Sequence, residues 1–474
     1  MSDNNKNELV IIGAGPGGYR AAYMAADLGL NVTVIDPEIN PGGVCLYRGC
    51  IPTKALLHLA KIMKDATTAG EMGINFSDPD IDIEKVRAWK SDVVKKLTGG
   101  LGQLIKSRKI NYIQGIARFI EPGKISVETK ESGEKKISYK NIIIAAGAKP
   151  LSVPGIDLSN PLVMNSSDSL ELNDMPDNLL IVGGGYIGLE MATIYNAFNI
   201  EVSIVELTDD FMPGMDKDLI AAYKKEGEKI FKDIFLKSKV TKIENSGKQL
   251  KVEFEDKNKK KFSNKYDKVL VAVGQKPNSD NLGLENTSVE LDEKGFIKVN
   301  EKQQTSEKGI YAIGDVAGPP LLAHKAGYEG KIAAEVIAGK KSVNDAKAIP
   351  AVIYTEPEIA TCGLSEKEAK EKNIEYKKVK FPWSASGRAV AMNAKNGFTK
   401  ILIDPENERI LGAGIVGKNA GDMIAELVLA IEMAATADDV ALTVHPHPTL
   451  SETIMEAAEI FYGHPGHIHA RKKI

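Results

Sequence analysis

Two stretches of the chain, 170 residues apart, repeat one pattern of apolar and polar positions. Residues 9–36 read LVIIGAGPGGYRAAYMAADLGLNVTVID, and residues 179–206 read LLIVGGGYIGLEMATIYNAFNIEVSIVE. Each has an apolar run, a glycine-rich turn, a helical segment of small residues, a second apolar run and a final carboxylate. This pattern predicts a strand–helix–strand unit of the Rossmann type, which binds a dinucleotide. Two such units predict two bound dinucleotides.

The glycines and carboxylates of the two units occupy matching positions. The first glycine permits a tight turn, the second lets the backbone approach a pyrophosphate, and the third lets the helix pack on its strand. Free N–H groups at the helix N-terminus then face the phosphates. A carboxylate 23 residues after the first glycine can accept hydrogen bonds from the ribose hydroxyls. The residues concerned are Gly13, Gly15, Gly18 and Asp36 in the first unit, and Gly183, Gly185, Gly188 and Glu206 in the second.

The carboxylate of the second unit also indicates which nicotinamide coenzyme is preferred. Glu206 would repel the 2′-phosphate of NADP, and residues 207–210 (LTDD) contain no arginine to bind that phosphate. The sequence therefore predicts NAD rather than NADP.

Beyond these units, the pattern predicts a strand hairpin and a separate C-terminal domain. Residues 251–274 (KVEFEDKNKKKFSNKYDKVLVAVG) are typical of a hairpin, with the lysine run 257–261 as its solvated turn. From about residue 348, four strand patterns (AVIYT, YKKVKF, FTKILID, ILGAGIVG) accompany helical ones such as MIAELVLAIEMAA. We predict an α/β fold in which residues 1–148 and 149–274 form two Rossmann-like domains. Residues 275–347 then complete the first domain, and 348–474 form an α+β interface domain.

Composition narrows the class of protein. At 474 residues the chain is too long for a single core. Its net charge of −3 gives no field that would favour nucleic acid or anionic lipid. The start MSDNNKNELV lacks the features of a signal peptide, and Arg20 and Glu190 interrupt the two apolar stretches that resemble membrane spans. Three cysteines argue against a disulfide-stapled secreted protein. We expect a cytoplasmic protein that binds neither nucleic acid nor membrane.

Two of the three cysteines directly follow the first unit, in PGGVCLYRGCIPTKALLH. Pro52 suits the first turn of a helix, which places Cys50 near a helix N-terminus, where the dipole favours a thiolate. Cys45 is five residues earlier, about 8–9 Å away in a regular helix and out of reach of a disulfide. A bonded pair therefore needs an irregular segment, and such a strained disulfide is more often redox-active than structural. The alternative is two unpaired buried thiols.

Near the C-terminus, HPHPTLSE (445–452) places Glu452 five residues after His447. Such a pair can act as a base and its orienting carboxylate, and His445 is secondary. A His–Pro turn before a helix that starts near Ser451 is the alternative, which the presence of the cysteines disfavours. The final GHPGHIHARKKI is interpreted as a mobile, weakly basic tail, since no cysteine or acidic cluster nearby completes a metal site.

Taken together, these motifs resemble the flavin-dependent pyridine nucleotide–disulfide oxidoreductases, from about residue 8 to about residue 462. The chain departs from the usual pattern at Tyr47 and Arg48, which put a charge between the cysteines, and at Gln275, where arginine is more usual. The resemblance is carried by GGVCLYRGCIPTK, AAGAKP (145–150), GGGYIGLE (183–190), VGQKPN (273–278), YAIGDV (311–316), LAHKA (322–326), FPWSASGRA (381–389) and HPHPTLSE.

The resemblance implies that FAD occupies the first unit and the nicotinamide coenzyme the second. It also implies that Lys54 approaches the flavin and pairs with Glu190, and that Cys45 and Cys50 form a redox disulfide. The implied cofactor contacts are Gly13, Gly15, Gly18, Asp36, Lys54, Gly115, Asp315 and Ala323 for FAD, and Gly183, Gly185, Gly188, Glu190, Glu206, Val240 and Gly274 around the second unit.

The resemblance further implies a homodimer in which His447, oriented by Glu452, serves the disulfide of the other subunit. The expected reaction is oxidation of dihydrolipoamide carried by the lipoyl domains of a 2-oxoacid dehydrogenase complex, with docking onto its acyltransferase core. His447 would take a thiol proton, Cys45 would be attacked and Cys50 would leave as a thiolate, with the electrons passing through FAD to NAD. A related flavin disulfide reductase or a flavin transhydrogenase is the alternative.

Overall fold

The two repeated units form parallel strand pairs with the same register in the computed structural model, which describes residues 7–129 and 133–469. In the first unit, β1 (Asn7–Ile12) pairs with β2 (Val32–Asp36) so that Leu9 lies opposite Val32. In the second, β8 (Asn178–Val182) pairs with β9 (Glu201–Glu206) so that Leu179 lies opposite Val202. Leu179 and Val202 lie 170 positions after Leu9 and Val32, so the repeat in the sequence is also a repeat in the structure.

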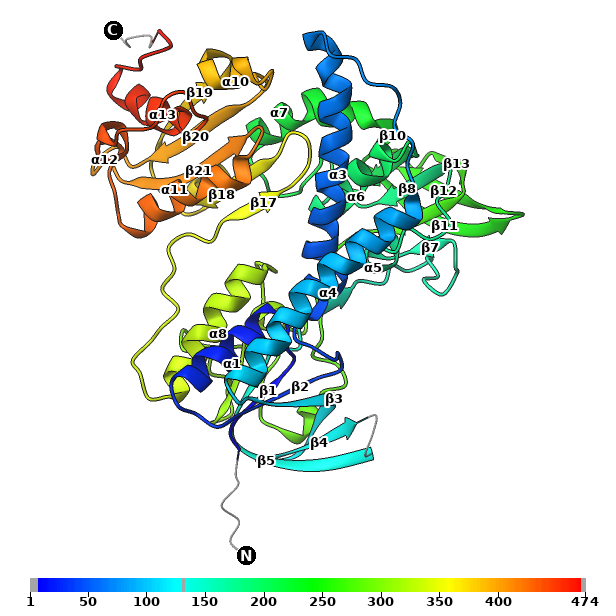
Figure 1. Cartoon of the computed structure of the whole chain (residues 1–474), viewed down its shortest axis with the longest axis vertical. Helices are drawn as coiled ribbons and strands as arrows, with labels where there is room; N and C mark the ends of the chain where they lie inside the picture. Colours follow the sequence, from blue (N-terminus) through cyan, green and yellow to red (C-terminus); the bar gives the residue numbers. More distant parts are fainter. Residues whose placement is uncertain (1–6, 130–132, 470–474) are drawn as a thin grey trace, which may run out of the picture.

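The first unit belongs to a sheet that receives a strand from far along the chain. β3 pairs with β2, β5 with β1, and β16 with β5, all in parallel. The far ends of β3 and β5 continue as an antiparallel ribbon with β4. Helices α1 and α8 pack side by side against this sheet (Figure 1). The bounds are β3 (Asn111–Glu121), β4 (Lys124–Thr129), β5 (Gly133–Ile144), β16 (Ile310–Ala312), α1 (Pro16–Asp27) and α8 (Ala323–Ile337).

The second unit forms a five-stranded parallel sheet with the order β10-β9-β8-β14-β7. Beside it lies the predicted hairpin, in which β12 and β13 pair antiparallel and β11 completes a three-stranded sheet. The bounds are β7 (Val163–Met164), β10 (Phe231–Leu236), β11 (Ser238–Ser246), β12 (Gln249–Asp256), β13 (Lys261–Tyr266), β14 (Lys268–Val271), α5 (Ser166–Ser169), α6 (Tyr186–Ala197) and α7 (Lys217–Gly227).

The chain leaves the first sheet and returns to it through a two-stranded antiparallel ribbon. Strand β6 (Ala148–Pro150) leads out, and β15 (Gln275–Pro277) leads back and pairs with it. After β15 the chain reaches β16 in the first sheet, so residues on both sides of the second unit build one sheet.

The C-terminal part forms an antiparallel sheet with the order β17-β18-β21-β20-β19. Four of its strands lie in the four predicted segments, and the fifth, β18 (Ile359–Gly363), was missed by the sequence pattern because it is short and ends in cysteine and glycine. The other bounds are β17 (Ala351–Ile353), β19 (Lys377–Pro382), β20 (Phe398–Ile403), β21 (Ile410–Val416), α9 (Glu366–Glu371), α10 (Gly387–Ala391), α11 (Ala420–Glu432), α12 (Ala437–Leu442) and α13 (Glu452–Tyr462).

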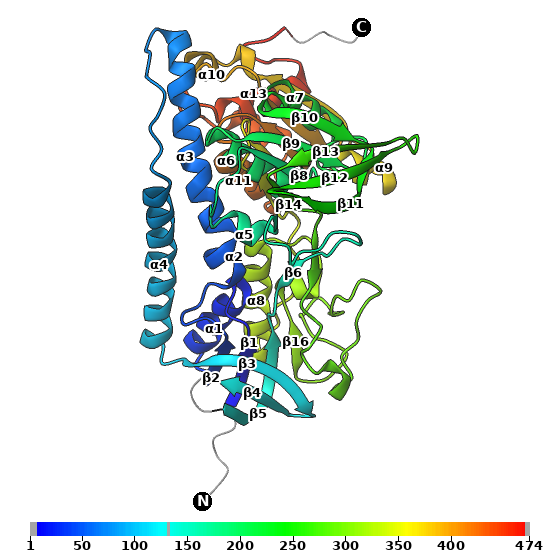
Figure 2. The same cartoon turned by 90° about the vertical axis from the view of Figure 1, so that its right-hand side faces the viewer.

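A long helix connects the three parts. The cysteine segment forms α2 (Gly43–Arg48) and α3 (Cys50–Ala69), followed by α4 (Ile83–Ser107). Figures 1 and 2 show α3 running from the first unit along α6 toward α10. Its Leu56 and Leu57 belong to a core shared with the second unit and the C-terminal sheet. Within residues 7–129 and 133–469, no helix is both long and apolar enough to cross a membrane.

Candidate active site

The two cysteines face each other across a break between two helices. Cys45 lies in the short α2, and Cys50 is the first residue of α3. Gly49 between them has φ −143° and ψ −115°, which ends α2 and lets the second helix start in a new direction. Both cysteines are unbonded, with their side chains hydrogen-bonded to each other. The break at Gly49 supplies the irregular geometry that a pair five residues apart requires.

The surroundings of the pair make the two thiols chemically different. The hydrogen bond from Cys45 and the nearby Lys54 ammonium lower the pKa of Cys50, although burial opposes this shift. The same hydrogen bond, together with burial, raises the pKa of Cys45. Cys50 also lies at the N-terminus of a 20-residue helix, whose dipole favours a negative charge. The arrangement favours a thiolate on Cys50 and a thiol on Cys45.

Lys54 links this segment to the second unit. Its Nζ donates to both carboxylate oxygens of Glu190, at 3.0 and 2.8 Å, and Glu190 is only 3% exposed. Glu190 also accepts a hydrogen bond from the backbone N–H of Tyr354 at 3.0 Å, and Lys54 Nζ lies 4.6 Å from the centre of the Tyr354 ring. One turn of α3 thus brings a cation beside Cys50 and anchors it on α6.

The cysteine segment also rests directly on the first glycine turn. Gly42 N–H donates to Ala14 O at 2.8 Å. A Cβ on Gly43 would lie 2.6 Å from Gly15 Cα, so only glycine allows this approach. The cysteine segment and the first glycine turn are therefore in contact, a contact that the sequence pattern did not reveal.

The three glycines of each turn have different surroundings. Gly13 and Gly183 have positive φ, +96° and +111°. A Cβ on Gly18 or Gly188 would lie 1.9 or 2.2 Å from the carbonyl oxygen of the first glycine of its own turn. In contrast, a Cβ on Gly15 would meet only Gly43 Cα at 3.9 Å, and one on Gly185 would meet nothing within 4 Å. The middle glycines therefore leave open space in front of α1 and α6, as a bound pyrophosphate requires.

The terminal carboxylates hold the same turns from the other side. Ala14 N–H donates to Asp36 at 2.6 Å, and Gly184 N–H donates to Glu206 at 2.6 Å. Burial raises the pKa of Asp36, partly offset by the hydrogen bonds from Ala14 and Glu38. Both Asp36 oxygens and Glu206 Oε2 keep a further lone pair for a ribose hydroxyl, whereas Glu206 Oε1 already accepts from the N–H and the hydroxyl of Thr208. Asp36 and Glu206 thus also fasten the glycine turns, which spacing alone did not predict.

A cavity of about 1210 Å³ opens in front of the second turn. Its walls include five of the residues expected to bind the coenzyme, but no arginine among the described residues. The cavity continues past Tyr186 to the C-terminal sheet, where Lys400 and Cys362 line it. The five expected residues are Gly183, Gly185, Glu206, Val240 and Gly274.

The remaining residues expected at the first unit approach it from three elements. Gly115 directly follows Gln114, which pairs with Asp36, and its Cβ would lie 2.6 Å from Glu128 O. Asp315 is in the turn after β16, where burial raises its pKa and Lys325 opposes the shift. Ala323 begins α8. Two buried residues of α8 hold the Asp315 turn, since Lys325 donates to Gly314 O at 3.2 Å and Glu329 accepts from Gly314 N–H at 2.7 Å.

His447 and Glu452 form a hydrogen-bonded pair at the start of α13. His447 Nδ1 donates to Glu452 at 2.8 Å, and the His447 side chain is 73% exposed. Burial raises the pKa of Glu452, but the Thr449 N–H and His447 outweigh it, so the pKa is lowered. His445 uses both ring nitrogens, on Thr443 O and Glu426. Figure 2 shows α13, which begins with Glu452, well away from α2, which contains Cys45.

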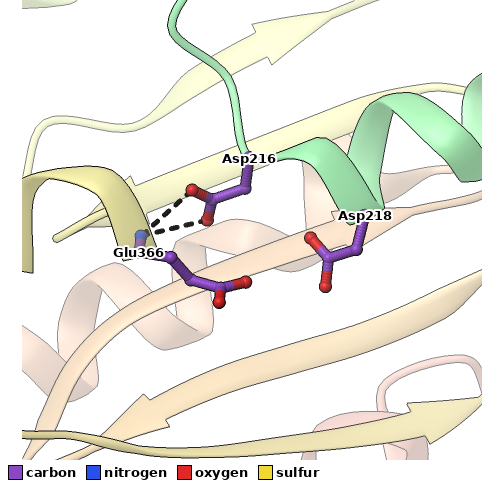
Figure 3. A group of neighbouring side chains, drawn as sticks. All are labelled: Asp216, Asp218 and Glu366. Carbon is purple, nitrogen blue, oxygen red and sulfur yellow. Dashed lines mark hydrogen bonds between the residues drawn. The ribbon is translucent and has the colours of Figure 1, made fainter. Parts of the chain in front are cut away.

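Three carboxylates, those of Asp216, Asp218 and Glu366, come within 4.8 Å of one another and could suggest a metal site (Figure 3). The space between them is taken by Lys400, which donates to them at 2.8, 2.7 and 3.1 Å. Asp216 also accepts the Glu366 backbone N–H, drawn as dashed lines in Figure 3. This cluster is an ion-pair junction between α7 and the C-terminal sheet.

Comparisons with known proteins place these features in one family. The pyridine nucleotide-disulphide oxidoreductase model matches residues 7–330, and the dimerisation domain of the same family matches residues 349–458. The chain belongs to the pyridine nucleotide-disulphide oxidoreductases. Their dimerisation domain supports a homodimer, and the family uses FAD and NAD(H).

Full-length relatives narrow the position within the family. The dihydrolipoyl dehydrogenase of Vibrio cholerae is 46% identical over 463 residues, which covers 98% of this chain and 97% of that protein. That of Geobacillus stearothermophilus is 43% identical with 98% coverage of both. Among solved structures, the HOCl-induced flavoprotein disulfide reductase RclA of Escherichia coli has a TM-score of 0.85 at 27% identity, covering 96% of this chain and 99% of that one. LpdA of Mycobacterium tuberculosis shares the fold, with a TM-score of 0.89.

The C-terminal tail differs from the expectation of a mobile segment. Glu456 of α13 accepts hydrogen bonds from the backbone N–H of Gly466 and from the His467 ring, so this part of the tail folds back on α13. The pairing is visible only in three dimensions, because Glu456 lies on the apolar face of a helix. The last five residues of the predicted tail, 470–474, lie outside the described residues.

Proposed function

We propose that this chain oxidises protein-bound dihydrolipoamide to lipoamide and passes the electrons through FAD to NAD. The observation that carries the proposal is the cysteine pair itself. Cys45 and Cys50 are in hydrogen-bond contact. Gly42 and Gly43 of the same segment rest on the first glycine turn, and Lys54 joins the segment to the helix of the second turn. The dihydrolipoyl dehydrogenases that match the chain over nearly its whole length support this choice of substrate.

The residues around the first turn fit FAD. The open space beside Gly15, the N-terminus of α1 and the Asp36 carboxylate suit a pyrophosphate and an adenosine ribose. We assign the isoalloxazine side to Lys54, beside Cys50, and further contacts to Gly18, Gly115, Asp315 and Ala323. FAD, when bound, supplies two-electron transfer between the cysteine pair and the nicotinamide.

The residues around the second turn fit NAD. The space beside Gly185 and the cavity lined by Gly183, Val240 and Gly274 suit its pyrophosphate and nicotinamide ribose. Gly188 shapes the turn, Glu190 holds Lys54, and Glu206 would accept a ribose hydroxyl at Oε2, because Oε1 is held by Thr208. A 2′-phosphate would meet the Glu206 carboxylate with no arginine in the described wall to balance it. NAD is therefore the preferred coenzyme.

The thiol chemistry follows from the different pKa shifts of the two cysteines. With the pair oxidised, a substrate thiolate attacks Cys45 Sγ, the Cys45–Cys50 bond breaks, and Cys50 leaves as a thiolate stabilised by Lys54. The second substrate thiolate then attacks the substrate sulfur bound to Cys45. That step releases the cyclic disulfide lipoamide and leaves both electrons on the two cysteine sulfurs.

The proton acceptor is the His447–Glu452 pair of the other subunit in the homodimer. The exposed ring of His447 leaves Nε2 free to take the thiol proton, because Nδ1 is held by Glu452. The proposal includes the partners and location expected from the sequence: lipoyl domains and the acyltransferase core of a 2-oxoacid dehydrogenase complex, in the cytoplasm.

An anaerobic titration of the purified protein with dihydrolipoamide tests this function. We expect reduction with a long-wavelength absorbance band from a thiolate beside the flavin, and reoxidation by NAD but not by NADP. The Cys45→Ser variant should keep its yellow colour and lose lipoamide production. A protein that NADH reduces but dihydrolipoamide does not would instead be a disulfide reductase for another substrate or a transhydrogenase, and the roles of Cys45 and His447 would be withdrawn.

A further inference from the structure

A chain of buried hydrogen bonds lies behind the His447–Glu452 pair. Trp383 Nε1 lies 3.1 Å from Thr399 Oγ1, Thr399 Oγ1 lies 2.8 Å from Thr453 Oγ1, and Thr453 Oγ1 lies 2.7 Å from Leu450 O. All three side chains are fully buried. They come from the turn after β19, from β20 and from α13, so the hydrogen-bond chain links one edge of the C-terminal sheet to α13.

The direction of each hydrogen bond is fixed. The indole of Trp383 can only donate, and the carbonyl of Leu450 can only accept. Thr453 therefore uses its one proton on Leu450, and Thr399 must donate to Thr453. Such a head-to-tail series of buried bonds is mutually strengthening, and breaking any link leaves a buried polar group without its partner.

The Trp383 end of this series of hydrogen bonds is held rigidly. The backbone N–H of Trp383 donates to Gly397 O at 2.9 Å. A Cβ on Gly417 would lie 2.2 Å from the Trp383 ring, and one on Gly397 would lie 3.0 Å from it. Because both positions are glycine, the backbone packs directly against the Trp383 ring, and this packing fixes the position of the indole N–H.

The end of the chain is the turn that carries the acid–base pair. Leu450 lies three residues after His447 and two before Glu452, and its carbonyl also accepts the Thr453 backbone N–H at 3.0 Å. Within the turn, Glu452 is held by His447 at 2.8 Å and by Thr449 N–H at 2.7 Å. Within the described part of the chain, the exposed His447 ring makes no hydrogen bond other than the one to Glu452, so its position depends on the turn.

We propose that the Trp383–Thr399–Thr453 chain is a positioning element that sets the orientation of Glu452 and His447 for proton transfer from the substrate thiol. The inference rests on the proposed function. The three residues touch neither substrate nor cofactor, and they act through the Leu450 carbonyl. A misplacement of about 1 Å at a reacting group can lower a rate about 100-fold.

The test replaces the two hydroxyls by methyl groups of similar size. We expect Thr453→Val and Thr399→Val to lower kcat for oxidation of dihydrolipoamide with NAD by about tenfold to a hundredfold, with a smaller effect on KM. Thr453→Ser and Thr399→Ser keep the hydroxyl and should restore most of the rate. The double valine variant should be little slower than either single one, because both break the same chain.

Two controls separate positioning from folding. Reduction of ferricyanide by NADH needs the two dinucleotide sites but no thiol proton transfer, so it should be unchanged in every variant. Thr305→Val removes a hydroxyl that donates to Ile310 O at 2.9 Å outside the C-terminal sheet, and it should leave lipoamide turnover unchanged. Where a valine variant fails to fold, Trp383→Phe breaks the first link instead.

The outcomes are distinguishable. A wild-type protein that turns over dihydrolipoamide while the valine variants and Trp383→Phe turn it over equally fast would refute the positioning role. Serine variants as slow as the valine variants would refute it as well. A wild-type protein without dihydrolipoamide turnover would overturn the proposed function itself, and this inference with it.

Discussion

Lys400 offers a sharp test of how the second unit is held on the C-terminal sheet. Its side chain is 1% exposed and its Nζ donates to three carboxylates, of Asp216, Asp218 and Glu366. Burial lowers the pKa of Lys400, but the hydrogen bonds that it donates to Asp216 and Asp218 outweigh burial and raise the pKa overall. Methionine has a similar length and no charge, so Lys400→Met removes the buried cation from the three carboxylates, of which Asp218 and Glu366 keep only the more exposed Lys378, at 3.7 and 3.0 Å.

Removing one partner of a buried ion pair costs about 3–5 kcal/mol, since the remaining charges stay desolvated. In a cooperative unit of about 150–250 residues, about 1 kcal/mol moves the unfolding midpoint by about 2–4 °C. We therefore expect Lys400→Met to lower the midpoint by about 6–20 °C at neutral pH. Thermal unfolding followed by circular dichroism at one scan rate measures this difference.

The difference should depend on pH in a defined direction. Burial raises the pKa of Glu366, but Lys378 and Lys400 outweigh it and lower the pKa, so this carboxylate stabilises the wild type above its unfolded pKa and loses that effect as the pH falls. Lys400, with a raised pKa, stays charged throughout the acidic and neutral range. In Lys400→Met the crowded carboxylates take up protons more readily. The difference in unfolding midpoint between wild type and Lys400→Met should therefore become smaller as the pH is lowered from about 7.5 to about 4.5.

A matched variant shows whether burial is the cause. Lys418 pairs with Asp65 at 3.0 Å on the surface, where such a pair contributes about 0–1 kcal/mol. Lys418→Met should therefore barely change the midpoint. Two results would refute this reasoning: an equal fall of the unfolding midpoint in Lys400→Met and Lys418→Met, or a difference between wild type and Lys400→Met that does not change with pH. Either would show that Lys400 does not stabilise the protein through the three carboxylates.

Two further predictions concern the second dinucleotide turn. Gly185→Ala should fold normally but bind NAD at least about tenfold more weakly in calorimetric titrations, because the added methyl enters the open space before α6. Gly188→Ala, in contrast, should unfold at a lower temperature, because its Cβ would lie 2.2 Å from Gly183 O. Normal NAD affinity in a stable Gly185→Ala protein would contradict the pyrophosphate assignment. Glu206→Ser should raise KM for NAD by about tenfold, because the ribose loses its hydrogen bonding to a charged group. The same change should make NADP a comparable coenzyme. An unchanged preference for NAD would show that Glu206 does not select the coenzyme.

The elements that sequence patterns predicted well are those whose contacts lie close along the chain. The glycine turns follow from local backbone requirements, and the apolar runs on either side specify buried parallel strands, so both units and their common register were predictable. The hairpin of β12 and β13 is equally local. β18 was missed because five residues ending in cysteine and glycine carry too weak a strand pattern.

The contacts that could not be predicted join residues far apart in sequence. Lys400 meets Asp216 across 184 positions, and Thr399 meets Thr453 across 54. A lysine in the apolar strand β20, or a threonine in an apolar helix face, gives no sign of its partner. Glu456 is a similar case, because its role in holding the tail depends on where residues 466 and 467 return. Burial of a polar residue can be suspected from its apolar neighbours, but the partner that satisfies it cannot.

The repeat explains how the cysteine segment is held between the two units. Glu190 in the second unit corresponds to Arg20 in the first, since the two differ by the same 170 positions as the glycines. Arg20 is exposed, whereas Glu190 is buried and holds Lys54 at 2.8 Å. One position of a duplicated helix has thus diverged into the carboxylate that fixes the cation beside Cys50. Because Gly43 rests on the first glycine turn and Lys54 is anchored on α6 of the second unit, the cysteine segment contacts both repeated units.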